Sequence, residues 1–172
     1  MLSKCIDTPV GSLVLVAEGG FLVSARFGCT GNERTVAPAV SLPDYLVLER
    51  AEEQLQLWFA GSCADFDLPL APKGTPFQCA VWTALRRIPR GKTVSYSAIA
   101  DAVGNPLAVR AVGMANNRNP LPIFIPCHRV VGKGGNLTGY AAGLEVKAWL
   151  LRHEGVFVHP DYMCDVTNPS FY

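Results

Sequence analysis

The chain has 172 residues, 49% of them hydrophobic and 17% charged, with a formal net charge of +1. This length suits one medium domain, or one domain with a small N-terminal lobe, and it can bury a core without metal or disulfide staples. No apolar run approaches the ~20 residues of a membrane span and the first residues lack a signal-peptide pattern, so we expect a cytoplasmic protein without a membrane partner.

The charge is distributed unevenly along the chain. Residues 1–72 hold four basic and nine acidic side chains, whereas residues 73–153 hold eleven basic and two acidic ones. Residues 154–172 hold three acidic side chains and no basic ones. A net charge of +9 in the middle segment is typical of a protein that binds a polyanion such as DNA, and a solvated basic surface is the alternative.

The six cysteines occur without a repeated spacing. This pattern fits a reducing compartment better than a disulfide framework, and it contains no C-x-x-C pair. We therefore expect no metal site, and a zinc site that uses Cys5, Cys29 or Cys63 is the alternative that the sequence leaves open. Because cysteine is among the most buried residue types, most of these side chains are predicted to be small core residues: Cys5, Cys29, Cys63, Cys79 and Cys164.

The first 72 residues predict a small α/β domain. Residues 10–17 and 21–27 are rich in valine, leucine and phenylalanine, and they predict two antiparallel strands joined by a Glu-Gly-Gly turn. A polar loop over 28–43 precedes a helix over 44–60, in which apolar residues recur at helical spacing. Residues 66–70 predict a further short strand. We find no catalytic constellation in this region.

Residues 73–172 predict a second, mainly helical domain, which follows a linker over residues 71–74. Thr75 and Pro76 are typical of a helix start, and this helix is expected to stop at residues 89–91. A last helix is predicted over 144–153, with Gly155 just beyond its end. The remaining tail is expected to lie on the surface.

Between these helices the sequence favours a helix-turn-helix. The first helix, over 96–103, begins after Ser95 and ends at the turn residue Gly104, and the second runs from 107 to about 116. We expect the second helix to present Arg110 and Asn116 to solvent. Within the basic segment, such a pair of helices indicates DNA binding.

The most informative stretch is Ile-Pro-Cys-His-Arg-Val at residues 125–130, between an apolar segment and a glycine-rich loop. A thiol at such a boundary can be half buried and still reachable, so Cys127 is a candidate nucleophile. His128 is the candidate base, but it needs a turn or a bridging water to reach the thiol, because adjacent side chains on an extended chain point to opposite sides. Glu154 is the candidate carboxylate that orients the histidine.

This stretch, with Asn119-Pro120 before it and Gly-Tyr-Ala-Ala-Gly-Leu at 139–144 after it, resembles the O6-alkylguanine-DNA alkyltransferases, also called methylated-DNA–protein-cysteine methyltransferases. The likeness covers roughly residues 75–155. It implies repair of double-stranded DNA by irreversible transfer of the alkyl group from O6-alkylguanine, or O4-alkylthymine, to Cys127. It further implies one turnover per molecule, no cofactor, and a monomer, and it leaves open whether several copies bind DNA side by side.

The resemblance also implies residue roles. Cys127 takes the alkyl group. His128 activates the Cys127 thiol through a water molecule, and Glu154 supports His128 from its other side. Asn119 braces the site, and Tyr96 donates a hydrogen bond or a proton to N3 of guanine. The base pocket is implied to contain Val130, Tyr140, Ala141 and Ala142, and the phosphate contacts are implied to come from Gln78, Ser97, Asn105 and Lys133.

Two further expectations concern DNA and the size of the adduct. The family pattern implies that the second helix of the pair lies in the minor groove and that Arg110 fills the place of the flipped-out nucleotide. Ala142 stands where the family commonly has glycine. Its extra methyl group predicts a lower tolerance of bulky O6 adducts.

Two other functions use parts of the same pattern. A damage-sensing binding module of the same fold lacks the cysteine that this chain keeps. A Cys-His-Glu hydrolase or acyltransferase uses the same three residues but leaves the basic segment and Arg110 unexplained. Irreversible, covalent alkylation of the protein by alkylated DNA would distinguish the repair protein from the sensor. Turnover of esters or amides would indicate the hydrolase.

Overall fold

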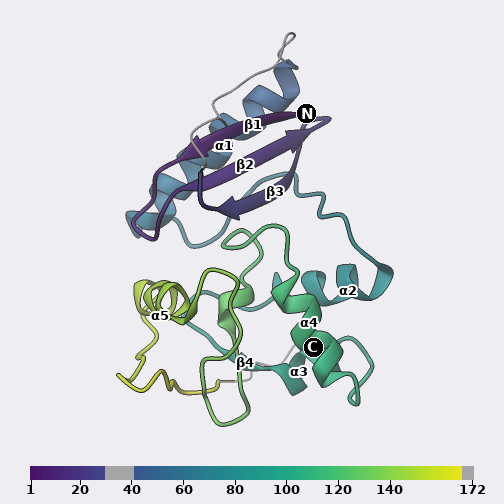
Figure 1. Cartoon of the computed structure of the whole chain (residues 1–172), viewed down its shortest axis with the longest axis vertical. Helices are drawn as coiled ribbons and strands as arrows, with labels where there is room; N and C mark the ends of the chain where they lie inside the picture. Colours follow the sequence, from purple (N-terminus) through teal and green to yellow (C-terminus); the bar gives the residue numbers. More distant parts are fainter. Residues whose placement is uncertain (30–40, 168–172) are drawn as a thin grey trace. The chain divides into compact units, whose positions relative to one another are not determined.

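The N-terminal unit pairs an antiparallel sheet with one helix that covers a face of it (Figure 1). Its elements are β1 (Leu2–Ile6), β2 (Leu13–Glu18), β3 (Phe21–Phe27) and α1 (Leu42–Phe59), with the strand order β1-β2-β3. Along β2, the side chains of every second residue share one face of the sheet. Leu13, Leu15 and Ala17 lie on that face and are fully buried, as expected where one face of a sheet meets the core. On α1 the buried apolar side chains recur at helical spacing: Val47, Leu48, Ala51, Leu55 and Trp58.

The structure, a computed structural model, describes residues 1–29 and 41–167. The chain divides into two compact units, Met1–Lys73 and Gly74–Tyr172, and the boundary predicted from the sequence lies one residue earlier. No helix in the described ranges is long and apolar enough to cross a membrane. The predicted loop over 28–43 lies for the most part outside these ranges.

Three details of the N-terminal unit differ from the prediction. β1 was not predicted, because its five residues mix polar and apolar types without a clear period. β2 begins at Leu13 instead of residue 10, since Gly11 adopts φ +107°, outside the extended region. The predicted strand over 66–70 is reduced to an isolated parallel bridge between Leu70 and Leu22.

The cysteine prediction was wrong for most of the residues it covered. Cys5 of β1 and Cys29 form a disulfide, with Cα atoms 6.3 Å apart. Cys63 and Cys79 are half-buried free thiols, and Cys164 alone among these five is a buried free thiol as predicted. The pairing could not be read from the sequence, because the sheet brings together two residues that are 24 positions apart.

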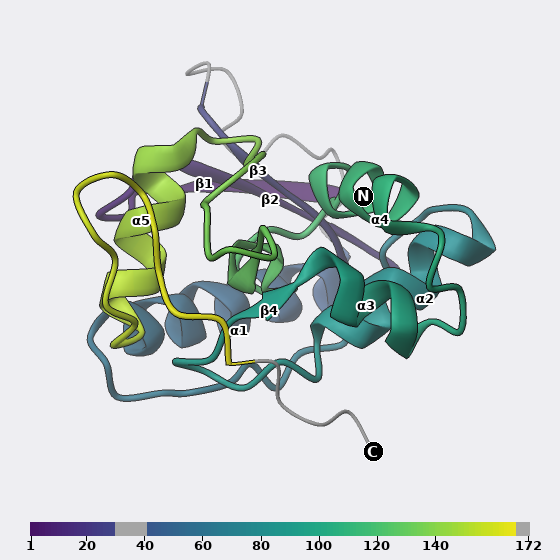
Figure 2. The ribbon, with the colours of Figure 1, turned by 90° about the horizontal axis from the view of Figure 1, so that it is seen from below.

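The C-terminal unit is mainly helical, so the predicted fold class is confirmed. Its elements are α2 (Pro76–Leu85), β4 (Val94–Ser95), α3 (Tyr96–Ala102), α4 (Val109–Asn117), the 3₁₀ helix η1 (Cys127–Arg129), β5 (Val130–Val131) and α5 (Leu144–His153). β4 and β5 pair in parallel. Within this unit α5 lies on the side opposite α3 and α4, with β4 between them (Figures 1 and 2).

Side-chain caps fix where these helices begin. The Thr75 hydroxyl accepts from the Gln78 amide at 3.3 Å, and the Gln78 side chain accepts from the Thr75 amide at 2.9 Å, which makes a complete capping box for α2. Ser95 caps α3 by accepting from the Ala98 amide. α4 begins later than predicted, because residues 105–108 form a turn closed by the Ala108 amide and the Asn105 carbonyl.

Two residues of the tail beyond Gly155 belong to the core, so the surface position predicted for the whole tail was wrong for these two. Val158 and Cys164 are buried with residues of β5 and α5 in one apolar cluster. Backbone hydrogen bonds from Leu137 to Tyr162 and from Cys164 to Gly135 fix the tail in place. The sequence hid this, because the tail shows no helical or strand period and only a few of its side chains turn inward. The last five residues of the predicted tail lie outside the described part of the chain.

Candidate active site

A braced loop positions Cys127 at the start of η1. The Cys127 amide donates to the Ile125 carbonyl at 2.8 Å, and the side chain of Asn119 spans the loop by donating to that carbonyl at 2.8 Å and accepting from the Leu121 amide at 3.0 Å. Ile123, between them, adopts φ +74°, a strained conformation for a β-branched residue. The thiol is only 4% exposed, which is less than the half-buried position that the sequence suggested.

Asn116 ties the loop to α4. It is buried, and its side-chain amide donates to the Cys127 carbonyl at 3.4 Å, so its predicted exposure to solvent was wrong. The reason is the helical spacing: Val112, Ala115 and Asn116 form the inward face of α4. Trp82 of α2 holds the same turn by donating to the Ala115 carbonyl at 2.9 Å.

The turn at η1 places His128 against the end of α5. His128 Nε2 lies 3.0 Å from Glu154 Oε1, and both side chains are buried. Arg129, which the sequence reading missed, donates to both oxygens of the same carboxylate, from Nε to Oε2 at 2.9 Å and from Nη2 to Oε1 at 2.6 Å. Its Nη1 donates to the Ile88 carbonyl at 2.5 Å. The structure therefore brings the predicted Cys-His-Glu residues into one buried cluster.

The cluster sets the protonation of its members. Burial alone would raise the pKa of Glu154, but the neighbouring imidazole and guanidinium hold that pKa well below its usual range. Burial lowers the pKa of His128, against the opposing effect of Glu154, so the imidazole is neutral at neutral pH. Burial raises the pKa of the Cys127 thiol, which the Asn119 side chain and the charge of Lys147 partly oppose.

Lys147 is a second residue that the sequence reading missed. Its side chain is fully buried on the inner face of α5, and Nζ donates to the carbonyls of Val130 at 2.6 Å and Thr138 at 2.8 Å. Burial lowers the pKa of Lys147 to about 8, and the charges of Cys127 and Cys164 oppose this shift. One signal in the sequence could have predicted its burial: Lys147 directly precedes Ala148, on the apolar stripe of the last helix.

We expect the stability of the protein to rise between about pH 8 and pH 10.5 through Lys147. The unfolded lysine, with its ordinary pKa of 10.5, binds a proton over this range that the folded lysine has released. The gain amounts to about 3 kcal/mol. Urea unfolding at pH 7.5 and pH 10 measures it. Lys147→Met should lack this rise and the exposed control Lys133→Met should keep it; equal slopes in all three proteins would contradict the assignment.

Lys147 connects to the predicted base pocket through the Val130 carbonyl, which it binds. The Tyr96 hydroxyl donates to the Thr138 carbonyl at 3.2 Å, the same carbonyl that Lys147 binds. Burial raises the pKa values of Tyr96 and Tyr140, so both phenols keep their protons at neutral pH. Of the other predicted pocket residues, Val130 is buried, Ala141 is exposed and Ala142 is half-buried.

The predicted DNA contacts lie on α2, on the pair α3 and α4, and on loops of the same unit. Arg110 is exposed on α4, and α3 packs against that helix. Gln78 uses its side-chain oxygen in the capping box, and the Ser97 hydroxyl lies 2.9 Å from the Ser95 hydroxyl. The two remaining predicted contacts are exposed: Asn105 and Lys133.

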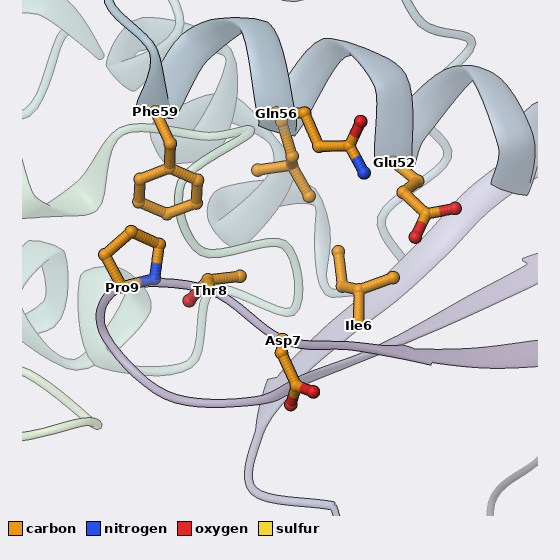
Figure 3. Close-up of a pocket in the computed structure, with 8 residues that line it drawn as sticks. Ile6, Asp7, Thr8, Pro9, Glu52, Gln56 and Phe59 are labelled. Atoms are coloured by element: carbon orange, nitrogen blue, oxygen red, sulfur yellow. The ribbon is translucent and has the colours of Figure 1, made fainter.

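A separate pocket lies within the N-terminal unit, between α1 and the connection that follows β1 (Figure 3). Its volume is about 240 Å³, and Phe59 faces Pro9 across it while Asp7 points away from the helix. None of the predicted site residues lines this pocket. In the described ranges, no group of three or more His, Cys, Asp or Glu side chains is arranged to hold a metal ion.

Comparisons with known proteins agree on one family. Residues 76–156 match the family model described as 6-O-methylguanine DNA methyltransferase, DNA binding domain. A methylated-DNA–protein-cysteine methyltransferase of Methanosarcina acetivorans is 45% identical over 155 residues, which cover 90% of this chain and 99% of that protein. The constitutive protein of the same name from Bacillus subtilis is 60% identical over 110 residues, which cover 63% of this chain and 67% of that one.

Solved structures show the same likeness. Mycobacterium tuberculosis OGT in complex with DNA aligns with a TM-score of 0.77 and 42% identity, over 88% of this chain and 91% of that one. The structure of O6-methylguanine methyltransferase from the same organism aligns with a TM-score of 0.76 and 41% identity, over 90% and 93% of the two chains. The similarity therefore extends over both units.

Proposed function

Because the chain belongs to the family of methylated-DNA–protein-cysteine methyltransferases, we propose that Cys127 is the residue that takes the alkyl group from O6 of guanine in double-stranded DNA. One observation carries this assignment. Cys127 begins the 3₁₀ turn that places the neutral imidazole of His128 against the buried carboxylate of Glu154. A neutral histidine beside a thiol can take its proton, and the carboxylate fixes the orientation of the ring.

The proposed step is a direct displacement. The sulfur of Cys127 forms a bond to the alkyl carbon while the bond from that carbon to O6 breaks, and the thiol proton passes to His128. The departing guanine keeps the electron pair, stabilised by a hydrogen bond from Tyr96 to N3, and regains a proton from His128 through solvent. The raised pKa of Tyr96 suits this donor role, because the phenol stays protonated. The thioether is not cleaved by water, so each molecule acts once.

The buried thiol requires the damaged nucleotide to leave the duplex. A thiol that is 4% exposed cannot reach a base stacked inside DNA, so the nucleotide must be flipped into the pocket. We propose that α3 and α4 act as a helix-turn-helix whose second helix enters the minor groove. Arg110, exposed on that helix, would then fill the gap left in the base stack.

Arg110→Ala is expected to weaken binding to the lesion duplex by roughly 10- to 100-fold, which corresponds to the loss of about 1–3 kcal/mol of groove contacts. Transfer at saturating DNA should fall less than binding, since Arg110 does not touch the thiol cluster. Fluorescence anisotropy with a labelled duplex measures the affinity. Arg152→Ala, an arginine on α5, is the matched control, and an equal loss in both variants would contradict a specific role for Arg110.

Ala142→Gly is expected to speed transfer of benzyl relative to methyl groups, because Ala142 adds a methyl group to the proposed pocket loop. A gain of roughly 5- to 10-fold corresponds to about 1 kcal/mol of relieved crowding. Competition between O6-benzylguanine and O6-methylguanine duplexes measures this ratio. Ala141→Gly, one residue earlier, is the control. Comparable rates on both adducts in the unchanged protein would contradict the crowding.

The function is tested by intact mass spectrometry before and after incubation with a duplex that contains O6-methylguanine. We expect one added methyl group, mapped by peptide analysis to Cys127 and absent after incubation with the unmodified duplex. A methyl group on Cys63, Cys79 or Cys164 instead would overturn the assignment of the nucleophile. Tight binding without any adduct would indicate a damage sensor.

A further inference from the structure

All three nitrogens of the Arg129 guanidinium donate hydrogen bonds within the protein. The side chain is 5% exposed, and its three nitrogens donate to both Glu154 oxygens and to the carbonyl of Ile88, a residue that follows α2. A bidentate pair of this kind fixes both the position and the plane of a carboxylate. Arg129 therefore joins the turn that carries Cys127 to the ends of two helices, α2 and α5.

One carboxylate oxygen serves two neighbours. Glu154 Oε1 lies 3.0 Å from His128 Nε2 and accepts from Arg129 Nη2 at 2.6 Å. An ionised carboxylate can only accept hydrogen bonds, so a neutral His128 must carry its proton on Nε2. The tautomer is thereby fixed, and Nδ1 is the ring atom that can accept a proton.

We infer that Arg129 is a positioning residue for alkyl transfer: by binding and neutralising the Glu154 carboxylate, it keeps His128 neutral and its Nδ1 ready to accept a proton. This inference rests on the proposed role of His128 as the base for Cys127. It assigns a chemical task to the third residue of the Cys-His-Arg run, separate from stabilising the fold.

The charges around His128 support this balance. The charged groups that act on the imidazole are Glu154 at the end of α5, Arg129 in the same turn and Lys147 on α5, and Cys127 precedes His128 in the chain. Glu154 favours a charged imidazole, whereas Arg129 and Lys147 disfavour it. Without the guanidinium, the buried carboxylate lacks its nearest cation, and protonation of His128 becomes the available way to compensate it.

The test compares how the single-turnover rate of methyl transfer depends on pH. In Arg129→Met, the pH at which the rate falls to half on the acid side should move up by at least about one unit. Arg129→Lys keeps the charge and should restore the midpoint, although not the full rate. Arg152→Lys is the control on α5, and its midpoint should stay where it is. A uniformly slower Arg129→Met with an unmoved midpoint would reduce Arg129 to a structural residue and overturn the inference.

A direct measurement decides the matter if Arg129→Met does not fold. ¹⁵N NMR of the histidine side chains should show His128 in the unaltered protein as a neutral Nε2–H tautomer at pH 7. In Arg129→Gln, which removes the positive charge but keeps a polar side chain, His128 should take up its proton at a higher pH, whereas Arg129→Lys, which keeps the charge, should leave that pH unchanged. A charged or Nδ1–H His128 in the unaltered protein would overturn the inference. This readout needs no alkyl transfer, so it stays separate from a failure of the proposed function, which would appear as an unmodified Cys127.

Discussion

Cys127→Ala is expected to abolish alkyl transfer completely and to keep binding to the lesion duplex. The product is a thioether, so the reaction needs a sulfur atom at this position. The nearest other cysteines in the sequence are Cys79 and Cys164, so no neighbouring residue can supply that sulfur. The helices proposed to bind DNA, α3 and α4, do not depend on the thiol, so the affinity should be retained. Mass spectrometry for the adduct and fluorescence anisotropy for binding, on the same samples, measure the two properties separately.

A matched control comes from the second buried thiol. Cys164 is 6% exposed and packs in the cluster between β5 and α5, so Cys164→Ala removes a sulfur of similar burial without touching the candidate site. It should lose some stability and still accept one methyl group. An adduct on the Cys127→Ala protein, or a loss of transfer in Cys164→Ala alone, would move the reaction away from Cys127.

Glu154→Gln is expected to slow transfer by about 10²- to 10⁴-fold, the usual contribution of positioned proton transfer. The amide cannot fix the His128 tautomer as the carboxylate does, because its nitrogen is a donor. It also leaves Arg129 buried without a counter-charge, which should cost about 3–5 kcal/mol of stability. Single-turnover kinetics and urea unfolding at pH 7 measure the two effects.

Acidification gives an independent check on Glu154. Because its pKa in the folded protein lies well below the ordinary value of 4.5, the carboxylate stabilises the fold above that value and loses this contribution as the pH falls toward the folded pKa. Glu154→Gln should therefore lose less stability than the unaltered protein below about pH 4.5. Glu145→Gln, at the exposed start of α5, is the control and should follow the unaltered protein. Transfer by Glu154→Gln within roughly threefold of the unaltered rate would contradict the proposed mechanism.

Local signals predicted the parts of the fold that depend on neighbours in the sequence. The Thr75-Pro76 start of α2 and the limits of α5 were predicted correctly, because caps and periodicity act within one or two turns. The Cys-His-Glu cluster was also anticipated, since its members lie in a recognisable run and at a helix end. The disulfide between Cys5 and Cys29 was missed, because only the folded sheet brings these residues together.

The residues that complete the site were missed for a related reason. Asn116, Arg129 and Lys147 are polar, and polarity alone places such side chains at the surface. In the structure each is buried with specific partners: a backbone carbonyl for Asn116, a carboxylate for Arg129 and two carbonyls for Lys147. A buried polar group is recognisable only when its hydrogen-bonding partners are known, and these come from distant parts of the chain.

The tail beyond α5 sets a limit on how the chain can be shortened. Val158 and Cys164 pack against apolar residues of β5 and α5, the elements that contain Val130 and precede Glu154. An exopeptidase or a truncation that removes residues 156–167 would expose the apolar side chains that this segment covers, among them Val131, Ala148 and Leu151. Trimming at this end should thus inactivate the protein without removing any residue of the candidate site, and a fusion partner is better attached beyond residue 167.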